Sequence, residues 1–499
     1  MKTKLFFYAL MLPLFIYSQE FTTYREDVFD PDGIEGDYFG NKFAVSPDGN
    51  TIVVTSPRYD GVTGTDANIG KASVYQYSNN SWEKIGNDIV GLQAGDYFGD
   101  AVDINATGDI IVVGAPSGSP NGNTYSGYVR VFQNVSGTWT QLGSDFIGGS
   151  TGVSLGRSIS LNADGTRLAV GIPGANTGTG EVKVYENNSG NWLQLGSTLE
   201  GLVTGENFGS TLDFNNDGDY LAVGAPYHNI NGTTSGQSRG QISVYQYSSD
   251  WNRVFNAEGS QANDRLGNTL ALSGNRGILA AGTRLGTGVP GYVKTYYSNG
   301  VSYTYFRDIF GLTNGDRFGS SLSLNNDGLF MAIGARFFNS SSSPRVYLYK
   351  RGQIEGVNHW VIQSGEYDDS VDASSGQSVA LNSEGNVLFT SSDTQNPNGI
   401  TGVIKTYADH STLTVENNVL QNQLAVYPNP ATHSLFIKSV SHSKINSVRV
   451  FDITGRLCVD KQINTLKEVR IDMNHLSKGS YLVKVQVENA TKTFKVLKN

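Results

Sequence analysis

Short runs of alternating or β-branched residues, separated by glycine-rich turns, follow one another along most of the chain. The clearest unit contains four of them, at residues 101–105, 110–113, 128–132 and 139–146. Thr107-Gly108 makes a turn after the first run, and Pro116 ends the second because proline cannot donate to a strand ladder. Alternating and β-branched residues fit pleated strands. The unit therefore predicts four antiparallel strands within about 56 residues.

The same unit recurs seven times. Gly-Asp-Tyr-Phe-Gly stands at residues 36–40 and 95–99, and related segments close on five later glycines. The seven closing glycines are Gly40, Gly99, Gly156, Gly209, Gly267, Gly319 and Gly376. Eight residues after each lies a turn position: Asp48, Thr107, Asp164, Asp217, Asn275, Asp327 and Glu384. Seven repeats of a four-stranded unit predict a seven-bladed β-propeller, an all-β fold.

The aromatic residues predict how the ring closes. All five tryptophans begin the fourth strand of a repeat: Trp82, Trp139, Trp192, Trp251 and Trp360. Tyr303 lies near that place in the fifth repeat, whereas the last repeat has three strands and no obvious fourth. Tyr24 has the same sequence context but precedes the first repeat. We expect residues 21–30 to complete the last blade and so protect its edge.

Composition agrees with this fold. Glycine is abundant, with 60 residues, and 58 of them lie before residue 424. Glycine disfavours helix interiors, and the many aromatic residues argue against disorder. Residues 424–499 carry a net charge of +7 and the remainder −16. The acidic body argues against binding nucleic acid, and the change of charge suggests a domain boundary.

The N-terminus has the pattern of a signal peptide, residues 1–18. Lys2 and Lys4 precede an apolar run at residues 5–17, which is too short to span a bilayer. No other stretch is apolar enough for a transmembrane segment. We therefore expect export via the periplasm. Cys458 is the only cysteine, so an internal disulfide is impossible and packing must stabilise the fold.

Residues 21–409 resemble the FG-GAP repeats of the integrin α-subunit propeller. The resemblance rests on the recurring Phe-Gly pairs and on Gly-Ala-Pro at residues 114–116 and 224–226. In that family several first hairpins carry a calcium loop, Asp-x-Asp/Asn-x-Asp-Gly with a further acid at the ninth place. Calcium needs six to eight oxygen ligands, so several acids must converge.

The calcium pattern is poorly matched in this chain. Asp213, Asn215 and Asp217 supply the first three ligand types, but Leu221 stands at the ninth place. Asp103-Ile-Asn-Ala-Thr107 lacks the third acid. Elsewhere the first position is Ala44, Ser160, Ala271, Ser323 or Ala380. We favour a tight turn without metal at each hairpin. A weak calcium site at Asp213 is the alternative, and no other cofactor is expected.

The loops between second and third strands carry side chains beyond simple turn formers. These loops share one face of a propeller with the blade-joining loops, which hold Asp37, Asp96 and Asp316. Aromatic and arginine side chains supply much of the energy at binding interfaces. The candidate ligand-binding residues are Arg58, Tyr59, Asp60, Tyr125, Tyr227, His228, Arg284, Arg336 and Phe337. The alternative is a solvated face with its aromatic residues folded back.

No catalytic residue is expected. Gly-Val-Ser154-Leu-Gly matches the nucleophile elbow of hydrolases, but no helix follows and Ser154 occupies the tyrosine place of the repeat. The six histidines form no short-spaced pair. An enzyme would need acids or histidines converging near the axis, where the first strands carry mostly small or hydroxylated residues, as at residues 158–161 and 320–324.

After a polar linker, residues 410–423, the last 76 residues contain several short alternating runs that predict a small Ig-like β-sandwich. Residues 424–499 closely resemble the type A C-terminal sorting domain of the type IX secretion system of Bacteroidota. The matching residues are Tyr427, Pro428, Asn429, Pro430, Asp452, Gly455, Gly479, Tyr481, Lys495 and Lys498. The resemblance implies recognition by the secretion and sortase machinery, passage across the outer membrane, and release or attachment at the cell surface.

Together these features predict a secreted or surface-displayed propeller at residues 19–409 that binds a glycan or protein without catalysing a reaction. An enzyme acting on extracellular polysaccharide or protein and a structural surface component are the alternatives, because a fold alone does not choose among them.

Overall fold

The computed structural model describes most of the chain. The described residues are 21–33, 36–61, 67–229, 237–283, 290–312, 314–336, 345–354, 357–365, 376–392, 402–409, 424–428, 430–439, 444–452, 457–465, 468–487 and 490–498. The chain forms two compact units, Met1–Asp409 and His410–Asn499. The expected signal peptide and linker lie outside the described residues.

The all-β prediction is confirmed. The described helical structure amounts to α1 (Ala175–Gly178), a single turn distorted by positive φ at Asn176 and Thr177. None of it has the length and hydrophobicity that a membrane-spanning helix would need.

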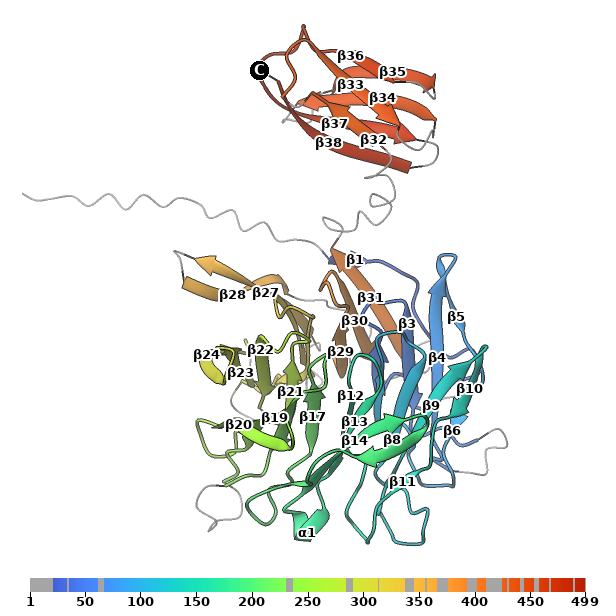
Figure 1. The fold of residues 1–499 in the computed structure, drawn as a ribbon, viewed down its shortest axis with the longest axis vertical. Coiled ribbons are helices and arrows are strands. Elements are labelled where there is room, and N and C mark those ends of the chain that lie inside the picture. The colour runs from blue at the N-terminus through green and yellow to red at the C-terminus, as the bar shows by residue number, and fades with distance from the viewer. Residues whose placement is uncertain are drawn as a thin grey trace, which may run out of the picture. The chain divides into compact units, whose positions relative to one another are not determined.

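Residues 21–409 form seven antiparallel sheets, numbered here in chain order (Figure 1). The first strands are β2 (Phe43–Val45), β7 (Ala101–Ile104), β12 (Ile159–Leu161), β17 (Thr211–Phe214), β21 (Thr269–Leu272), β25 (Phe318–Leu324) and β29 (Ser378–Leu381). The second strands are β3 (Thr51–Ser56), β8 (Ile110–Ala115), β13 (Arg167–Ile172), β18 (Tyr220–Ala225), β22 (Ile278–Gly282), β26 (Phe330–Ala335) and β30 (Val387–Ser392).

The third strands are β4 (Lys71–Ser78), β9 (Tyr128–Val135), β14 (Glu181–Asn188), β19 (Gln241–Tyr247), β23 (Tyr292–Ser298), β27 (Arg345–Ile354) and β31 (Val403–Asp409). The outer strands are β5 (Ser81–Lys84), β10 (Thr138–Gln141), β15 (Asn191–Gln194), β20 (Trp251–Glu258), β24 (Tyr303–Phe310), β28 (Val357–Gly365) and β1 (Phe21–Thr23). Short segments β6 (Ile89–Val90), β11 (Phe146–Ile147) and β16 (Leu199–Glu200) also pair with the third strands of sheets 1, 2 and 3.

The seven first strands contact one another in a closed cycle. Each lies against the first strand of the following sheet, and β29 of sheet 7 lies against β2 of sheet 1. Sheet 7 takes its outer strand from the beginning of the chain, because β1 pairs with β31 in the antiparallel sense. Figure 1 shows β1 beside β31.

The outer strands of sheets 1 to 3 differ from the single continuous strand that the sequence predicts. In sheet 2, residues 139–146 divide into β10 and β11 around Gly143, which has φ +87°. A Cβ atom at Gly143 would lie 2.7 Å from the Trp192 ring of sheet 3. Trp192 Nε1 donates to the Leu142 carbonyl at 3.0 Å. The strand therefore breaks where the next sheet's tryptophan packs against it.

The same contact recurs at two further junctions between sheets. Trp139 Nε1 donates to the Ile85 carbonyl at 3.0 Å, and Trp251 Nε1 donates to the Leu195 carbonyl at 3.0 Å. In sheets 4 to 6 the outer strands β20, β24 and β28 are continuous. The tryptophan positions found in the sequence thus hold neighbouring sheets together.

The second unit contains two antiparallel sheets that share one hydrophobic core. The three-stranded sheet consists of β32 (Leu424–Tyr427), β33 (Ser434–Ser439) and β36 (Val469–Asp472). The four-stranded sheet consists of β35 (Leu457–Thr465), β34 (Ile445–Asp452), β37 (Gly479–Val487) and β38 (Ala490–Lys498). Alternate residues, such as Val483 and Val485 of β37, are fully buried between the sheets.

Candidate functional site

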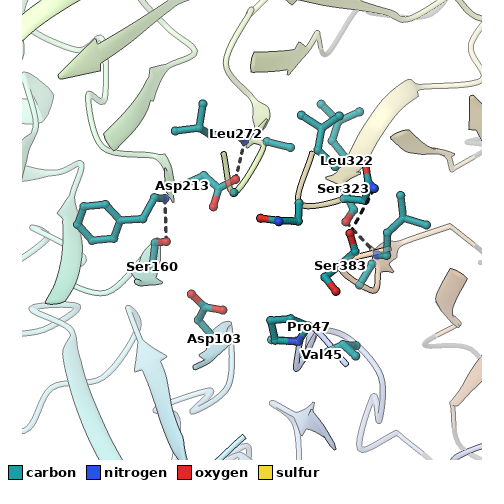
Figure 2. Close-up of a pocket in the computed structure, with 18 of the residues that line it drawn as sticks. Val45, Pro47, Asp103, Ser160, Asp213, Leu272, Leu322, Ser323 and Ser383 are labelled. Atoms are coloured by element: carbon teal, nitrogen blue, oxygen red, sulfur yellow. Dashed lines mark hydrogen bonds between the residues drawn. The ribbon is translucent and has the colours of Figure 1, made fainter. Parts of the chain in front are cut away.

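A cavity of about 380 Å³ lies at the first strands of the seven sheets (Figure 2). All seven sheets contribute to its wall. One position of each first strand is equivalent by register, since it pairs with the same place of the second strand. These seven residues are Ala44, Asp103, Ser160, Asp213, Ala271, Ser323 and Ala380. We call them the axial layer.

Polar side chains of the axial layer bind the next sheet. Asp103 Oδ2 accepts from Leu161 N at 2.7 Å, and Asp213 Oδ2 accepts from Leu272 N at 2.7 Å. The hydroxyls of Ser160 and Ser323 accept the equivalent amides of Phe214 and Leu381 at 3.1 and 3.0 Å. In Figure 2 the side chains of Asp103 and Asp213 point toward the cavity from separate strands. Each of these four side chains therefore accepts a hydrogen bond from an amide of the next sheet. Strand pairing within that next sheet leaves the amide free.

The two carboxyl groups have strongly perturbed acidities. Burial, aided by the nearby Asp103 charge and opposed by the hydrogen bond from the Leu272 amide, raises the pKa of the Asp213 carboxyl to about 8. Burial likewise raises the pKa of Asp103 to about 6, although the amides of Leu161 and Ile104 lower it. Pairs of acids with separated pKa values in a cavity are candidates for proton transfer. The sequence placed both acids only in a calcium pattern.

The hydroxylated positions of the first strands have a structural role as well. Ser158, Thr211, Thr269 and Ser321 lie near the start of four first strands. Each hydroxyl donates to the carbonyl of the closing glycine of the next repeat, at 2.6–2.8 Å. Small hydroxylated residues are thus used to join sheets at the axis.

The structure does not bring the predicted calcium ligands together around one point. Asp213 faces the cavity and binds Leu272, while the Asn215 amide oxygen accepts from the backbone of Asp219 and Tyr220 in the hairpin. Asp217 is exposed at the turn. Within the part of the chain that the structure describes, no three His, Cys, Asp or Glu residues are grouped to hold a metal ion.

The loops between second and third strands contact the sheet-joining loops. Tyr227 N donates to Glu206 O, and Ser154 N donates to Tyr125 O. We call these two sets of loops the loop face. Arg284 and Phe337 lie outside the described residues, so the structure does not place them.

Two arginine–tyrosine stacks form on the loop face. The Arg58 guanidinium lies 4.1 Å from the centre of the Tyr38 ring, and that of Arg265 lies 5.0 Å from the Tyr227 ring. Tyr38 and Arg265 both occupy the tyrosine place of the repeat and have positive φ. The sequence does not mark these two residues as binding candidates, because they stand within the repeat motif.

Among the other candidates of the loop face, some side chains are exposed and others make contacts that hold the loops in place. Tyr125 is 56 % exposed and has φ +53°. Tyr59 stacks with the buried Lys71 ammonium, and Asp60 accepts from Asn68 N at 2.7 Å. Arg336 N donates to the Ser320 hydroxyl. Tyr125 is therefore the most accessible described candidate.

His228 is buried, contrary to a role as an exposed ligand contact. Its Nδ1 lies in a hydrogen bond with Glu206, and its Nε2 lies 3.2 Å from Gln241 Nε2 and 3.7 Å from Glu258. The Glu206 carboxylate also accepts from Leu202 N. This cluster fastens the loop of sheet 4 to the preceding joining loop.

Acids at the second place of the repeat are buried too. Asp96 Oδ2 accepts from Leu92 N, Gln93 N and the Tyr128 hydroxyl at 2.7–3.0 Å. Asp316 Oδ1 accepts from Phe318 N at 2.9 Å. These carboxylates organise the joining loops, so a ligand on the loop face would not reach them without displacing backbone contacts.

Ser154 has φ +52°, as a nucleophile elbow could. The same place has positive φ in five other repeats: Tyr38, Tyr97, Asn207, Arg265 and Arg317. The conformation is therefore a property of the repeat rather than of a catalytic serine.

In the second unit, the described residues of the expected sorting signal support its fold. The Tyr427 ring stacks on Phe436 with centroids 6.0 Å apart, and its hydroxyl bonds to Glu468. Tyr481 is buried and donates to the Ser477 carbonyl at 2.8 Å. Gly479 and Lys498 pair across β37 and β38, as do Leu482 and Lys495. Pro428 and Pro430 are exposed and Asp452 ends β34, whereas Asn429 and Gly455 lie outside the described residues.

Comparison with protein families decides the nature of this unit. Residues 425–499 match the family described as the secretion system C-terminal sorting domain. The tail is a type IX sorting domain. A sorting domain of this kind implies interaction with the type IX secretion machinery and secretion or attachment at the outer surface.

The chain is also similar, at low sequence identity, to solved structures. A Bacteroides uniformis protein described as a 6-phosphogluconolactonase is similar with 13 % identity and a TM-score of 0.47, covering 67 % of this chain and 87 % of that one. Kuenenia stuttgartiensis hydrazine synthase is similar with 12 % identity and a TM-score of 0.48, covering 76 % and 99 %. No curated protein matches the sequence.

Proposed function

We propose that the protein is a seven-bladed, FG-GAP-like β-propeller that the type IX system displays at or releases from the cell surface, where it binds a glycan or protein ligand. The sorting domain carries the export part of the proposal. The closed cycle of seven first strands supports the propeller, and the two-sheet core of the tail supports a small Ig-like sandwich.

The export role can be tested with residues 424–499 fused to a periplasmic reporter in a bacterium that has the type IX system. We expect the reporter to reach the surface or medium, because the matched family supplies the sorting signal. A reporter fused to the same segment without residues 490–498, the last strand of the four-stranded sheet, is the control. Retention of the intact fusion in the periplasm would contradict the proposal.

Ligand binding is best supported at the loop face. Its arginine–tyrosine stacks and the exposed Tyr125 offer planar, aromatic and cationic surface, which interfaces use for affinity. A glycan array and a pull-down of surface proteins with the full chain would identify the ligand.

The variant Tyr227→Ala/Arg336→Ala tests whether this face is responsible. We expect it to abolish binding of the identified ligand while the melting temperature stays unchanged, because neither side chain belongs to a buried core. Asp217→Ala, an exposed turn residue, is the control. Loss of binding together with loss of the fold would count against a binding role.

A second candidate function is catalysis on an extracellular polysaccharide or protein. The two axial acids, Asp103 and Asp213, favour it because their pKa values are raised. Such a pair could supply a general acid and a general base. Hydrolysis of a substrate that Asp213→Asn abolishes with an unchanged fold would support it. Hydrolysis that this variant leaves unchanged would exclude the axial pair.

A further inference from the structure

A groove of about 370 Å³ lies between the outer parts of sheets 5 and 6. Tyr297, Tyr305, Phe306 and Arg307 contribute from sheet 5, and Arg351 and Asn358 from sheet 6. Tyr297 is 43 % exposed, and its ring lies against that of Phe306 with the centroids 6.4 Å apart. The Tyr305 ring packs on Tyr296 and beside the Lys294 ammonium instead. Pockets that bind small ligands have volumes of roughly 300–1,000 Å³, so the groove is large enough for one or two sugar rings.

The groove exists because this junction lacks the contact that closes earlier ones. In sheets 1 to 3 a glycine in the outer segment receives the next sheet's tryptophan, as Gly143 receives Trp192. In sheet 5 the continuous strand β24 carries Phe306 and Arg307 instead. Trp360 of sheet 6 donates its Nε1 farther inward, to Thr295 Oγ1 at 3.3 Å. The outer part of the junction therefore remains open.

The charges of the groove are cationic. Within the described part of the chain, neither Arg307 nor Arg351 has a carboxylate in an ion pair. Asp308, next to Arg307, lies 3.6 Å from Lys294 and serves that cation instead. The two arginines have no described counterion, although the body as a whole is acidic. Their guanidinium groups can therefore bind an anionic ligand.

We propose that this groove binds an acidic glycan through a hexuronate residue. A pyranose ring presents an apolar face of C–H groups that packs on an aromatic ring, and Tyr297 offers such a ring in the groove beside Phe306. The hexuronate carboxylate matches the planar fork of a guanidinium group. A neutral sugar would leave the two arginines without a partner, and an extended polyanion such as nucleic acid would meet the repulsion of the acidic body. This groove is a different surface from the loop face, so hexuronate binding here is separate from the ligand binding proposed for that face.

Calorimetric titration of the full chain with hexuronate trisaccharides tests the proposal. The probes are trimers of galacturonate, mannuronate and guluronate, each compared with its fully methyl-esterified form. We expect at least one acidic trimer to bind and its ester to bind roughly tenfold or more weakly, because the ester cannot accept a charge-assisted bidentate hydrogen bond. Failure of all three trimers to bind, or equal binding of acid and ester, would overturn the proposal.

Variants assign the binding to this groove. Arg307→Gln and Arg351→Gln keep the side-chain stem and should each weaken binding roughly tenfold or more with an unchanged melting temperature. Arg253→Gln, an exposed arginine on β20 of the neighbouring sheet, should leave binding unchanged. The loop-face variant Tyr227→Ala/Arg336→Ala should also leave it unchanged. If that variant abolishes hexuronate binding and the groove variants do not, the groove proposal is wrong while the proposed function stands.

Discussion

Acidic residues at different places of the repeat have different surroundings and different roles. Asp96 is buried among amide and hydroxyl donors and holds a joining loop. Asp213 has one amide donor, faces the axial cavity and lies near Asp103. Burial raises the pKa of Asp213 because only the Leu272 amide offsets the cost of removing its charge from water.

The raised pKa of Asp213 predicts a dependence of stability on pH. Between the ordinary Asp pKa of 3.8 and about 8, the folded state keeps a proton that the unfolded state has lost. Stability therefore falls as pH rises through this range. The variant Asp213→Asn has no proton to lose at this position, so it escapes this decrease in stability. The difference in unfolding free energy between the variant and the wild type should therefore rise with pH, by up to about 1.4 kcal/mol per pH unit. Urea unfolding at several pH values measures the trend.

Asp217→Asn, an exposed acid in the same hairpin, is the matched control. A difference between Asp213→Asn and the wild type that stays constant from pH 4 to pH 8 would show that the axial carboxyl titrates normally.

At the scale of elements, the sheets are joined by a few repeated contacts. Indole nitrogens bind the preceding sheet at its outer strand, and polar side chains of the axial layer bind the following sheet at its first strand. Both contacts satisfy backbone groups that pairing within one sheet leaves free. The outer contact also requires close approach, which a glycine permits.

Gly143→Ala should destabilise the protein because its Cβ would lie 2.7 Å from the Trp192 ring. Gly137→Ala is a matched control, since Gly137 also has φ +87° but nothing within 4 Å of its Cβ position. We expect Gly143→Ala to cost about 1–3 kcal/mol more than Gly137→Ala, as overpacking does. Chemical denaturation of both variants measures the difference. Equal losses would mean that backbone strain alone decides the effect.

At the scale of the whole first unit, the N-terminal segment connects sheet 7 to sheet 1. β1 pairs with β31 of sheet 7, while Asp30 lies 2.6 Å from the Lys71 ammonium of sheet 1, with both side chains buried. The Arg25 guanidinium binds the Gly49 carbonyl at 2.6 Å and lies 3.9 Å from the Tyr77 ring. The segment therefore contacts both sheet 7 and sheet 1, at the junction between the last and the first sheet of this unit.

Asp30→Ala should cost about 3–5 kcal/mol of unfolding free energy, because it leaves the buried Lys71 charge with only the more distant Asp88 carboxylate, at 4.0 Å. The double variant Asp30→Leu/Lys71→Met should be less destabilised than Asp30→Ala, since it removes both charges. Glu186→Ala, which breaks a more exposed pair with Arg167, should cost about 0–1 kcal/mol. Urea unfolding compares the three variants. A double variant that is less stable than Asp30→Ala would indicate that the charges themselves stabilise the closure.

Much of the fold was predictable because its signals are local. Residues 101–105, 110–113 and 128–132 correspond to β7, β8 and β9, since alternation and β-branching act within a strand. The break around Gly143 was not predictable from its own segment, because its cause is a tryptophan 49 positions later on another sheet. The burial of His228 could not be predicted from its own segment, because it depends on Glu206 and Glu258 from other segments.

The sequence by itself determined the repeated four-stranded unit, the all-β class and the sorting domain, because each rests on patterns within a few tens of residues. Only the tertiary structure decided that Asp103 and Asp213, 110 residues apart, face one cavity, and that the junction of sheets 5 and 6 stays open. Those features arise from packing between sheets, where side chains distant in sequence compete for the same space and the same free amides.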